Sequence, residues 1–445
     1  MTSARVDPGA LINDPGRRAS LARVFESALT AVDPASAVIS RLRREGNCLI
    51  AGERTIDLHD INRAIVLAFG KAAVPMAKAI VSAVGDLPTE GVVVSNVPEA
   101  VAGLTVMRAA HPVPDEASVL AARKLLEVAT SAGPRDVVLV AVSGGGSALL
   151  TLPTSDVPLA AIAETTSLLL RCGASIQELN TVRKHLSAVK GGRLAEAVGG
   201  AAAIVTLVVS DVVGDDLAVI ASGPMVPDPS TFTEALLILD RFDLRNAIPA
   251  PVLEHLLAGQ EGRVPETVTD GHLFRNQTIE LVATARTAAT GALNHAIALG
   301  WEAKVVSTAL TGEAVAAAAR IAEEASDLSP GEMLIYAGET TVTVDADGMG
   351  GRNQELALAA AIRLAGDDGV VLMSAGTDGI DGVTKAAGAF ADGRTLDRGA
   401  ALGLDAAEYL RRHDSYSYLS AVGDVIHTGP TGTNVGDLIL VARSG

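Results

Sequence analysis

The sequence predicts an α/β protein of two domains, with a mostly parallel sheet covered by helices on both faces. Four runs of apolar, largely β-branched residues each stop abruptly at a loop of small and polar residues, as expected of strands buried in a parallel sheet. Helical patterns alternate with these strands, which is the βαβ signature. Hydrophobic residues make up 49% of the chain and aromatic residues only 2%, a bias that favours helices packed on sheets over a β-sandwich.

The four runs span residues 64–71, 137–147, 204–216 and 370–381. Ligands of open α/β sheets bind just beyond the carboxyl ends of such strands. The loops at these ends carry a lysine, a glycine-rich turn with hydroxyl groups, and two groups of aspartates. This combination suits a phosphorylated ligand accompanied by a metal ion.

The remaining elements follow from periodicity and from turn residues. We predict a helical arm over residues 17–45 and a hairpin-like segment through residue 56. Further helices are expected over 116–132, 159–172, 184–198, 285–299, 313–326 and 353–364. Further strands are expected over 92–96, 304–307, 332–337, 340–345 and 438–441, with the strands near 335 and 345 paired.

Length and proline placement predict where the chain divides. A single hydrophobic core rarely grows beyond about 250 to 300 residues, so 445 residues indicate two domains. Prolines at 249, 251 and 265 punctuate the middle of the chain. We therefore predict an N-terminal domain over residues 1–255 and a C-terminal domain over residues 272–445.

Charge and cysteine content narrow the class of protein. The formal net charge is −17, without a long basic segment, which argues against nucleic acid as a partner. No run approaches the roughly 20 apolar residues of a membrane span. Two cysteines without CxxC spacing indicate a reducing compartment, and the N-terminus lacks the apolar core of a signal peptide. We expect a cytoplasmic protein without a membrane partner.

A glycine-rich loop follows the second strand run and provides a candidate phosphate site. Its residues are Ser143, Gly144, Gly145, Gly146 and Ser147. Glycines at the start of a helix let backbone N–H groups face an anion. The loop matches neither GxxxxGK[ST] nor GxGxxG with a distant acidic residue, so a tight strand-to-helix turn is the alternative interpretation.

Several cations could accompany this loop. Lys71 follows the first strand run and a glycine, where an idle surface lysine is unexpected. Arg183, Lys184 and Lys190 form a local basic group in an acidic chain, although a solvated helix face explains them equally well. His111 precedes a proline and either takes part in the site or braces a loop.

Carboxylates and an arginine mark the other two strand ends. Asp211 and Asp378 offer the hard oxygen ligands that Mg²⁺ prefers. Glu339 and Thr340 add polar groups after a predicted strand. Arg352 and Asn353 follow a run of glycines, where the planar guanidinium could bind a phosphoryl or carboxylate group bidentately or could only cap a helix.

Eight segments together resemble the class II glycerate 2-kinases, whose C-terminal part is the MOFRL domain. They are GKAAVPMAKA, AHPVPDEAS, SGGGSALL, LNTVRKHLSAVKGGRLA, SDVVGDDLAVIASGPMVPDPSTF, GGRNQELAL, SAGTDGIDG and TGPTGTNVGDL. The resemblance covers nearly the whole chain, and the segments occur in the family's order. It implies a larger Rossmann-like three-layer αβα domain, a smaller C-terminal α/β domain, and an active site in the cleft between them.

The resemblance also implies a reaction: ATP-dependent phosphorylation of D-glycerate at its 2-hydroxyl, with Mg²⁺ or another divalent cation. The family's important lysine matches Lys71 and its important arginine matches Arg352. Our hypothesis is that the loop at 143–147 cradles phosphate, and that Lys71 and Arg352 stabilise the transferring group or the glycerate carboxylate. Asp211 or Asp378 then holds the metal or orients the hydroxyl.

Three alternatives stay open at this point. Proteins of this kind have also been called NAD(P)H-dependent hydroxypyruvate reductases, although no GxGxxG fingerprint with a following acidic residue occurs after any strand. The acceptor could be another small hydroxy acid. A protein that senses glycerate without turning over ATP is the third alternative. As to assembly, we expect a monomer or a homodimer.

Overall fold

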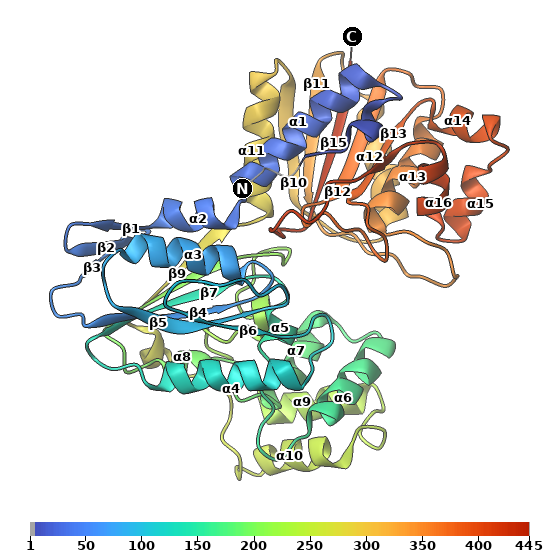
Figure 1. Cartoon of the computed structure of the whole chain (residues 1–445). Coiled ribbons are helices and arrows are strands. Elements are labelled where there is room, and N and C mark those ends of the chain that lie inside the picture. The colour runs from blue at the N-terminus through green and yellow to red at the C-terminus, as the bar shows by residue number, and fades with distance from the viewer. Residues whose placement is uncertain (1–4, 445) are drawn as a thin grey trace. The chain divides into compact units, whose positions relative to one another are not determined.

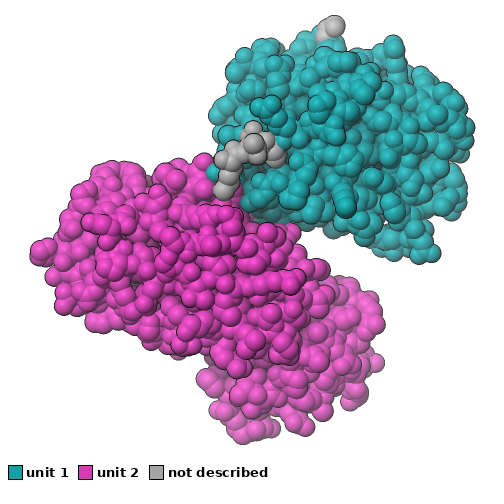
Figure 2. Space-filling model, viewed as in Figure 1, with its two compact units in different colours: residues 1–33, 211–214, 283–445 teal, residues 34–210, 215–282 magenta. Residues whose placement is uncertain are grey.

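The computed structural model describes residues 5–444, apart from the side chains of residues 272 and 273. It divides into two compact units, which Figure 2 colours separately. Unit 1 contains the N-terminal residues up to Asp33, the short stretch Asp211–Gly214, and the chain from Ala283 onward. Unit 2 contains Pro34–Ser210 and Asp215–Val282. The observed division therefore differs from our boundaries at 255 and 272, and the outermost residues of the two predicted domains lie outside the described part.

Unit 2 is built on a six-stranded sheet of order β6-β5-β4-β7-β8-β9 (Figure 1). The pairs β4–β5, β5–β6, β4–β7 and β7–β8 are all parallel. β7 and β8 are buried along their whole length, which explains their unbroken apolar sequences. The strands are β4 (Arg63–Phe69), β5 (Thr89–Ser95), β6 (Thr105–Arg108), β7 (Asp136–Val142), β8 (Ala203–Val209) and β9 (Gln277–Ala283).

Helices cover this sheet on both faces, with α3 on one side and α4 on the other (Figure 1). α4 begins with a capping box between Asp115 and Ser118. A separate apolar cluster joins α6, α7, α9 and α10. The helices of unit 2 are α2 (Pro34–Arg41), α3 (Ala73–Val84), α4 (Glu116–Thr130), α5 (Gly146–Leu149), α6 (Leu159–Arg171), α7 (Ile176–His185), α8 (Arg193–Ala197), α9 (Phe232–Arg241) and α10 (Ala250–Gln260), with short 3₁₀ turns η2 (Ile220–Ser222) and η3 (Gly271–Phe274).

Unit 1 holds a second six-stranded sheet, of order β10-β11-β15-β12-β13-β14. Only β10 and β11 pair in parallel; the other neighbours are antiparallel. The last strand, β15, therefore inserts between β11 and β12 in the middle of the sheet. The strands are β10 (Glu302–Leu310), β11 (Glu332–Gly338), β12 (Val370–Gly376), β13 (Gly388–Asp392), β14 (Val425–Ile426) and β15 (Asp437–Arg443).

The two faces of this second sheet are covered by different parts of the chain. Alternate strand residues such as Leu372 and Val441 pack into one core with α12, α13 and α16. On the opposite face Phe390 lies beneath the guanidinium of Arg18, at 5.0 Å from ring centroid to Cζ. The helices of unit 1 are α1 (Pro15–Ala31), α11 (Ala285–Ala298), α12 (Ala314–Ser326), α13 (Arg352–Leu364), α14 (Thr395–Ala401), α15 (Ala406–Arg411) and α16 (Ser415–Ala421), after the 3₁₀ turn η1 (Pro8–Leu11).

A buried ion cluster fastens α1 to the rest of unit 1. Arg18 is fully buried and donates to Asp392 and Asp424, both at 2.7 Å. Arg398 bonds the same two carboxylates. Removing one partner would leave a buried charge uncompensated, at a cost of about 3 to 5 kcal/mol. The cluster therefore holds α1, the first α-helix, against residues near the C-terminal end of the chain.

Most predicted elements are confirmed within a few residues at either end. The α/β class and the division into two units hold, and three of the four strand runs enter the parallel sheet as β4, β7 and β8. The three short antiparallel strands β1 (Leu42–Glu45), β2 (Cys48–Ala51) and β3 (Arg54–Asp57) correspond to the predicted hairpin-like segment. Among the described residues no helix is long and apolar enough to cross a membrane.

Two of the predicted helices are wrong in extent. The arm expected over 17–45 is two helices and a strand, because α1 ends before Pro34, which starts α2, and residues from Leu42 pair with β2. The helix expected over 184–198 does not form as one piece. Gly191 and Gly192 have φ of +58° and +80°, outside the helical region, and separate α7 from α8.

Two strand predictions are wrong as well. The run at 370–376 is a strand, but both of its neighbours are antiparallel, so it does not belong to a parallel sheet. Residues 340–345 form no strand and make one isolated bridge, between Thr341 and Glu313. Both edges of β11 are already occupied by β10 and β15, so no edge is left for a paired strand near 345.

Candidate active site

In unit 2 the ends of two central strands are joined through their backbones. Ser143, which follows β7, accepts a hydrogen bond at its Oγ from the N–H of Ala72 at 3.0 Å. The N–H of Lys71 donates to the carbonyl of Gly144 at 2.9 Å. A Cβ at Gly70 would lie 2.2 Å from the Ser143 hydroxyl oxygen, so only glycine permits this approach. The loop at 143–147 and Lys71 therefore form one structure.

Gly145 brings two further side chains to this loop. It has φ of +78°, and a Cβ built there would lie 2.8 Å from the His111 ring and 3.4 Å from Cγ of Lys71. Both side chains therefore lie against the glycine backbone. The contact of His111 with the loop fits both interpretations of this residue, a part in the site and a brace for the loop. This ensemble, which we call the loop site, comprises Lys71, His111, residues 143–147, and the cations described next.

Two cations, the buried Lys190 and the half-buried Arg183, support the loop without a carboxylate partner among the described residues. Lys190 Nζ donates to the carbonyls of Ser147 and Leu150, each at 2.8 Å, and Arg183 Nη2 donates to the Ser147 carbonyl at 3.3 Å. No ion pair joins either cation to a carboxylate in the described part of the chain. Burial lowers the pKa of Arg183, and burial together with Arg183 holds the pKa of Lys190 well below its usual range.

Burial disfavours the charged forms of Arg183 and Lys190, and no carboxylate in the described part of the chain offsets this effect, so a bound anion would stabilise their positive charge. Desolvating an unpaired cation costs on the order of several kcal/mol, and an anionic ligand would offset that cost. The helix that follows the loop, α5, is a single turn, so its N-terminus alone would not indicate an anion site. The evidence for such a site comes from the two cations.

A strained turn closes the other side of the loop. Ala221 and Ser222 have φ of +51° and +63°, which is rare for residues other than glycine and is found mostly at functional sites. Ser222 Oγ lies 2.8 Å from Ser147 Oγ and donates to Asn180 Oδ1 at 2.9 Å. Asn180 Nδ2 is buried and has no hydrogen-bond partner among the described residues.

Lys184 does not join the loop site. Its Nζ pairs with Asp228 at 3.2 Å, with side-chain exposures of 8% and 1%. The pair links α7 to the segment after β8 and is structural. The local basic group predicted from the sequence therefore separates into two cations at the loop and one in an internal ion pair.

In unit 1 the guanidinium of Arg352, at the start of α13, is held by two carboxylates. Its Nε and Nη2 donate to Asp437 at 2.6 and 3.0 Å, and its Nη1 lies 2.6 Å from Glu339 Oε1. Burial opposes the positive charge, but Asp437 and Glu339 outweigh it and raise the pKa of Arg352. The bidentate edge that we expected to bind a phosphoryl group is therefore already occupied by Asp437.

Asn353 is buried, and its side chain bonds residues of two strands or their ends. Its Nδ2 donates to Asp437 at 2.9 Å, and its Oδ1 accepts from Ser374 at 2.7 Å. The backbone N–H groups of Asn353 and Gln354 donate to Asp381, which thereby caps α13. Burial raises the pKa of Asp381 to about 6 in spite of these hydrogen bonds. This network fixes the orientation of Arg352.

Negative charge exceeds positive charge around Arg352. Burial raises the pKa of Glu339; Arg352 opposes this effect, whereas Asp437, Asp211 and Asp378 add to it. Asp211 accepts a hydrogen bond from Asn434 at 3.3 Å. We call this group, made of Arg352, Glu339, Asp437, Asp211 and Asp378, the acidic site.

The acidic site has the donors that Mg²⁺ takes, although they do not form a closed cage. No group of three or more His, Cys, Asp or Glu within residues 5–444 is arranged to hold a metal. Mg²⁺ commonly uses one or two protein carboxylates and completes its shell with water and phosphate oxygens. The surplus of carboxylates, which adds to the effect of burial on the pKa of Glu339, fits such a shared ion.

A cavity of about 430 Å³ adjoins the acidic site within unit 1. Thr340 is buried and lines it together with Glu339 and Arg352, while Glu355 and His413 line another part. His413 Nδ1 lies 2.9 Å from Glu355 and its Nε2 lies 3.1 Å from Asp345.

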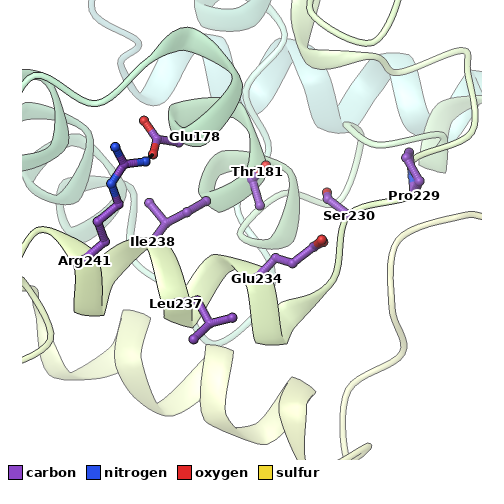
Figure 3. Close-up of a pocket in the computed structure, with 8 residues that line it drawn as sticks. All are labelled: Glu178, Thr181, Pro229, Ser230, Glu234, Leu237, Ile238 and Arg241. Carbon is purple, nitrogen blue, oxygen red and sulfur yellow. Dashed lines mark hydrogen bonds and ion pairs between the residues drawn. The ribbon is translucent and has the colours of Figure 1, made fainter.

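Figure 3 shows a different cavity, of about 460 Å³, between α7 and α9 of unit 2. Its cation, Arg241 on α9, reaches Glu178 on α7 and forms an ion pair with it. Glu234 also lines this cavity, so its carboxylates outnumber its one cation and it lacks the electrostatic signal of the loop site.

Sequence reasoning missed the partners that position the predicted residues. Asp437 lies in the segment TGPTGTNVGDL, and we predicted no role for it, although it binds Arg352 bidentately. Ser222 and Asn180 were not assigned roles. A small-residue turn at 221–224 directly after an aspartate-rich strand end was the available signal for Ser222; nothing in the sequence shows which arginine Asp437 would bind.

The fold and its two sites define an α/β protein with a glycine-rich loop among cations in one unit and a carboxylate-rich site in the other. Residues 20–257 match a family described as a domain of unknown function, DUF4147, and residues 332–437 match the MOFRL family. The chain belongs to the glycerate kinase family, and the resemblance inferred from its motifs is confirmed.

Relatives of known name support this membership. A D-glycerate 2-kinase of Thermotoga maritima is 42% identical, over 88% of this chain and 93% of its own. A glycerate 2-kinase of Pyrococcus horikoshii is 37% identical, over 94% and 95%. The crystal structure of a glycerate kinase from Thermotoga maritima superposes with a TM-score of 0.82 at 40% identity, covering 95% of this chain and 98% of that one.

Proposed function

We propose that the protein transfers the γ-phosphoryl group of ATP to the 2-hydroxyl of D-glycerate, giving 2-phospho-D-glycerate and ADP. Membership of the glycerate kinase family supports the reaction class. The observation that carries the proposal is the loop site: a glycine-rich turn supported by the buried Lys190 and the half-buried Arg183, which no described carboxylate neutralises. Such a site is suited to the phosphates of a nucleotide.

Phosphoryl transfer depends mainly on positioning and on neutralising charge at the transferring group. We assign phosphate binding to the loop at 143–147, supported by Arg183 and Lys190. We assign to Lys71, whose backbone is fixed to Gly144, the stabilisation of charge on the transferring group. The hydroxyls of Ser143 and Ser147 are engaged with Ala72 and Ser222, so they shape the loop.

In the acidic site, Asp211 and Asp378 would hold Mg²⁺, which supplies charge neutralisation between phosphate oxygens when bound. Asp437 occupies the Nε and Nη2 edge of Arg352. We therefore propose that Nη1 of Arg352, beside Glu339, contacts the transferring group or the glycerate carboxylate. We also assign Asp211 a catalytic role, in which its carboxylate orients the acceptor hydroxyl. Thr340 and Asn353 shape the site from buried positions.

A coupled assay tests the proposal. ADP release is followed with D-glycerate, ATP and Mg²⁺, and the product is offered to enolase. Direct consumption by enolase supports phosphorylation at the 2-hydroxyl. If enolase acts only after phosphoglycerate mutase is added, the phosphate lies on the 3-hydroxyl; ADP release only with another hydroxy acid would change the acceptor.

Reduction of hydroxypyruvate is the second candidate, because a protein of Agrobacterium vitis that is 38% identical over 96% of this chain and 94% of its own carries the provisional name hydroxypyruvate reductase. Oxidation of NADH or NADPH on addition of hydroxypyruvate would support it. A protein that binds glycerate but shows neither reaction would fit the sensor interpretation. The cytoplasmic location and the monomeric or homodimeric state stay predictions.

A further inference from the structure

A second cavity of unit 2 shares its cations with the loop site. It has a volume of about 420 Å³ and lies between the segment at 112–114, the residues after α5, and helices α6 and α7. Arg183 and Lys190 line it, and the same two side chains donate to the Ser147 carbonyl. The cavity therefore adjoins the glycine-rich loop. We call it the α6 pocket.

The walls of the α6 pocket are mostly apolar. Pro114, Ile162 and Leu170 are among its lining residues, and Leu170 is 58% exposed at residue level. Exposed apolar groups around a concave site are typical of ligand binding. Thr166 on α6 is half-buried in the wall, and no hydrogen bond of its hydroxyl is found among the described residues, so it can bond the edge of a ligand.

The ligand must therefore have an apolar, ring-sized part and an anionic part that reaches the loop. Glycerate, a three-carbon acid with a polar group on every carbon, matches neither the apolar walls nor the size of the pocket, since cavities of roughly 300 to 1,000 Å³ hold drug-sized ligands. A nucleoside polyphosphate has both parts.

We propose that the α6 pocket holds the base and ribose of the phosphate donor, with Arg183 and Lys190 below the point where its phosphates pass to the loop at 143–147. The proposal rests on the proposed function, since it places the donor of that reaction. It adds the residues that select a nucleotide over a bare polyphosphate, namely the apolar wall formed by α6 and residues 112–114.

Thr166→Trp tests this by filling the pocket without altering the loop site. We expect the Kd of ADP, measured by calorimetry, to rise about tenfold or more. The affinity for inorganic tripolyphosphate, which has no base, should change less than about twofold. In steady-state assays the KM for ATP should rise while the KM for D-glycerate stays near the wild-type value.

Leu237→Trp is the matched control. Leu237 is 59% exposed and lines the cavity of Figure 3, on α9 of the same helical cluster. This variant should bind ADP and tripolyphosphate like the wild type. Circular dichroism and thermal unfolding check that both variants fold, and Leu170→Trp, at the rim of the α6 pocket, replaces Thr166→Trp if the latter is unfolded.

An unchanged affinity for ADP in a folded Thr166→Trp protein would overturn the assignment of the pocket while leaving the kinase reaction intact. Equal losses for ADP and tripolyphosphate would also overturn it, because the pocket would then hold phosphate and not a base. A wild-type protein that neither binds ADP nor releases it from ATP with glycerate would instead overturn the proposed function, so the two failures are distinguishable.

Discussion

The loop site and the acidic site differ in the sign of their unbalanced charge. At the loop, the half-buried Arg183 and the buried Lys190 have carbonyl partners but no carboxylate partner in the described chain. At the acidic site a single arginine meets Glu339 and Asp437, and the nearby aspartates add further negative charge. The difference teaches which ligand each can take: anionic phosphate at the first and a divalent cation at the second.

The difference also changes how an arginine should be interpreted. A guanidinium is a phosphate ligand only to the extent that its donors are unoccupied. Arg352 looked like the better phosphate clamp from the sequence, yet two carboxylates already bind it. For Arg183 the sequence left an anion site and a solvated helix face equally open, and in the structure it has no carboxylate partner among residues 5–444.

The largest expected effect is the loss of either central cation. Lys71→Ala and Arg352→Ala should each lower kcat/KM by roughly 10² or more, because charge on the transferring group would lose a preorganised partner. Lys78→Ala, which removes an exposed lysine paired with Glu99, is the control and should stay near wild type. A loss below about threefold in either variant would remove that residue from the mechanism.

The next effect concerns the metal. Asp378→Asn should raise the Mg²⁺ concentration for half-maximal rate by about tenfold, since metal sites commonly lose that much when a carboxylate is neutralised. Asp405→Asn, which alters the cap of α15 in the same unit, should not shift the Mg²⁺ titration. Equal titrations in Asp378→Asn and the wild type would show that the negative charge at 378 does not serve a metal.

A smaller effect tests the close packing of the loop. Gly145→Ala and Gly432→Ala place a Cβ at similar φ, +78° and +81°, but only the first would meet other atoms, at 2.8 Å from His111. Both should lose about 1 to 2 kcal/mol through the left-handed backbone. Gly145→Ala should in addition weaken ATP binding, and an unchanged KM for ATP would contradict the role of the loop backbone.

The smallest effect is a pH dependence beside the acidic site. The hydrogen bond with Glu355 raises the pKa of His413 above its ordinary value of 6.5. Because the folded state binds the proton more tightly, this stabilisation is fully present below about pH 6.5 and is lost as pH rises through the elevated pKa. For a partly exposed pair we expect less than about 1 kcal/mol.

Thermal unfolding from pH 5 to 9 measures this effect as the difference between the wild type and His413→Gln. The difference should shrink as pH rises. His59→Gln is the control, because His59 is exposed and lies in the turn after β3. Its stability difference from the wild type gives the baseline for replacing an exposed histidine. A difference that does not vary with pH would mean that His413 contributes by packing alone.

Much of the fold was predictable because it depends on short-range patterns. α4, α6, α11, α12 and α13 begin and end close to the predicted residues, since amphipathic periodicity and capping residues act within one or two turns. The strand runs were found for the same reason. Strand direction was not predictable in unit 1, because an apolar run buried on both faces has the same sequence in a parallel or an antiparallel environment.

The sequence by itself determined the chemistry available to this protein: a glycine-rich loop, a lysine after a glycine, aspartates at strand ends, and the family motifs that contain them. These are local properties, fixed by residue type and spacing. Only the tertiary structure decided which charges are neutralised. It paired Arg352 with Asp437, 85 positions along the chain, and Lys184 with Asp228. It left the half-buried Arg183 and the buried Lys190 without a carboxylate partner among residues 5–444. Electrostatic balance depends on distance and burial in space, which the order of residues alone does not specify.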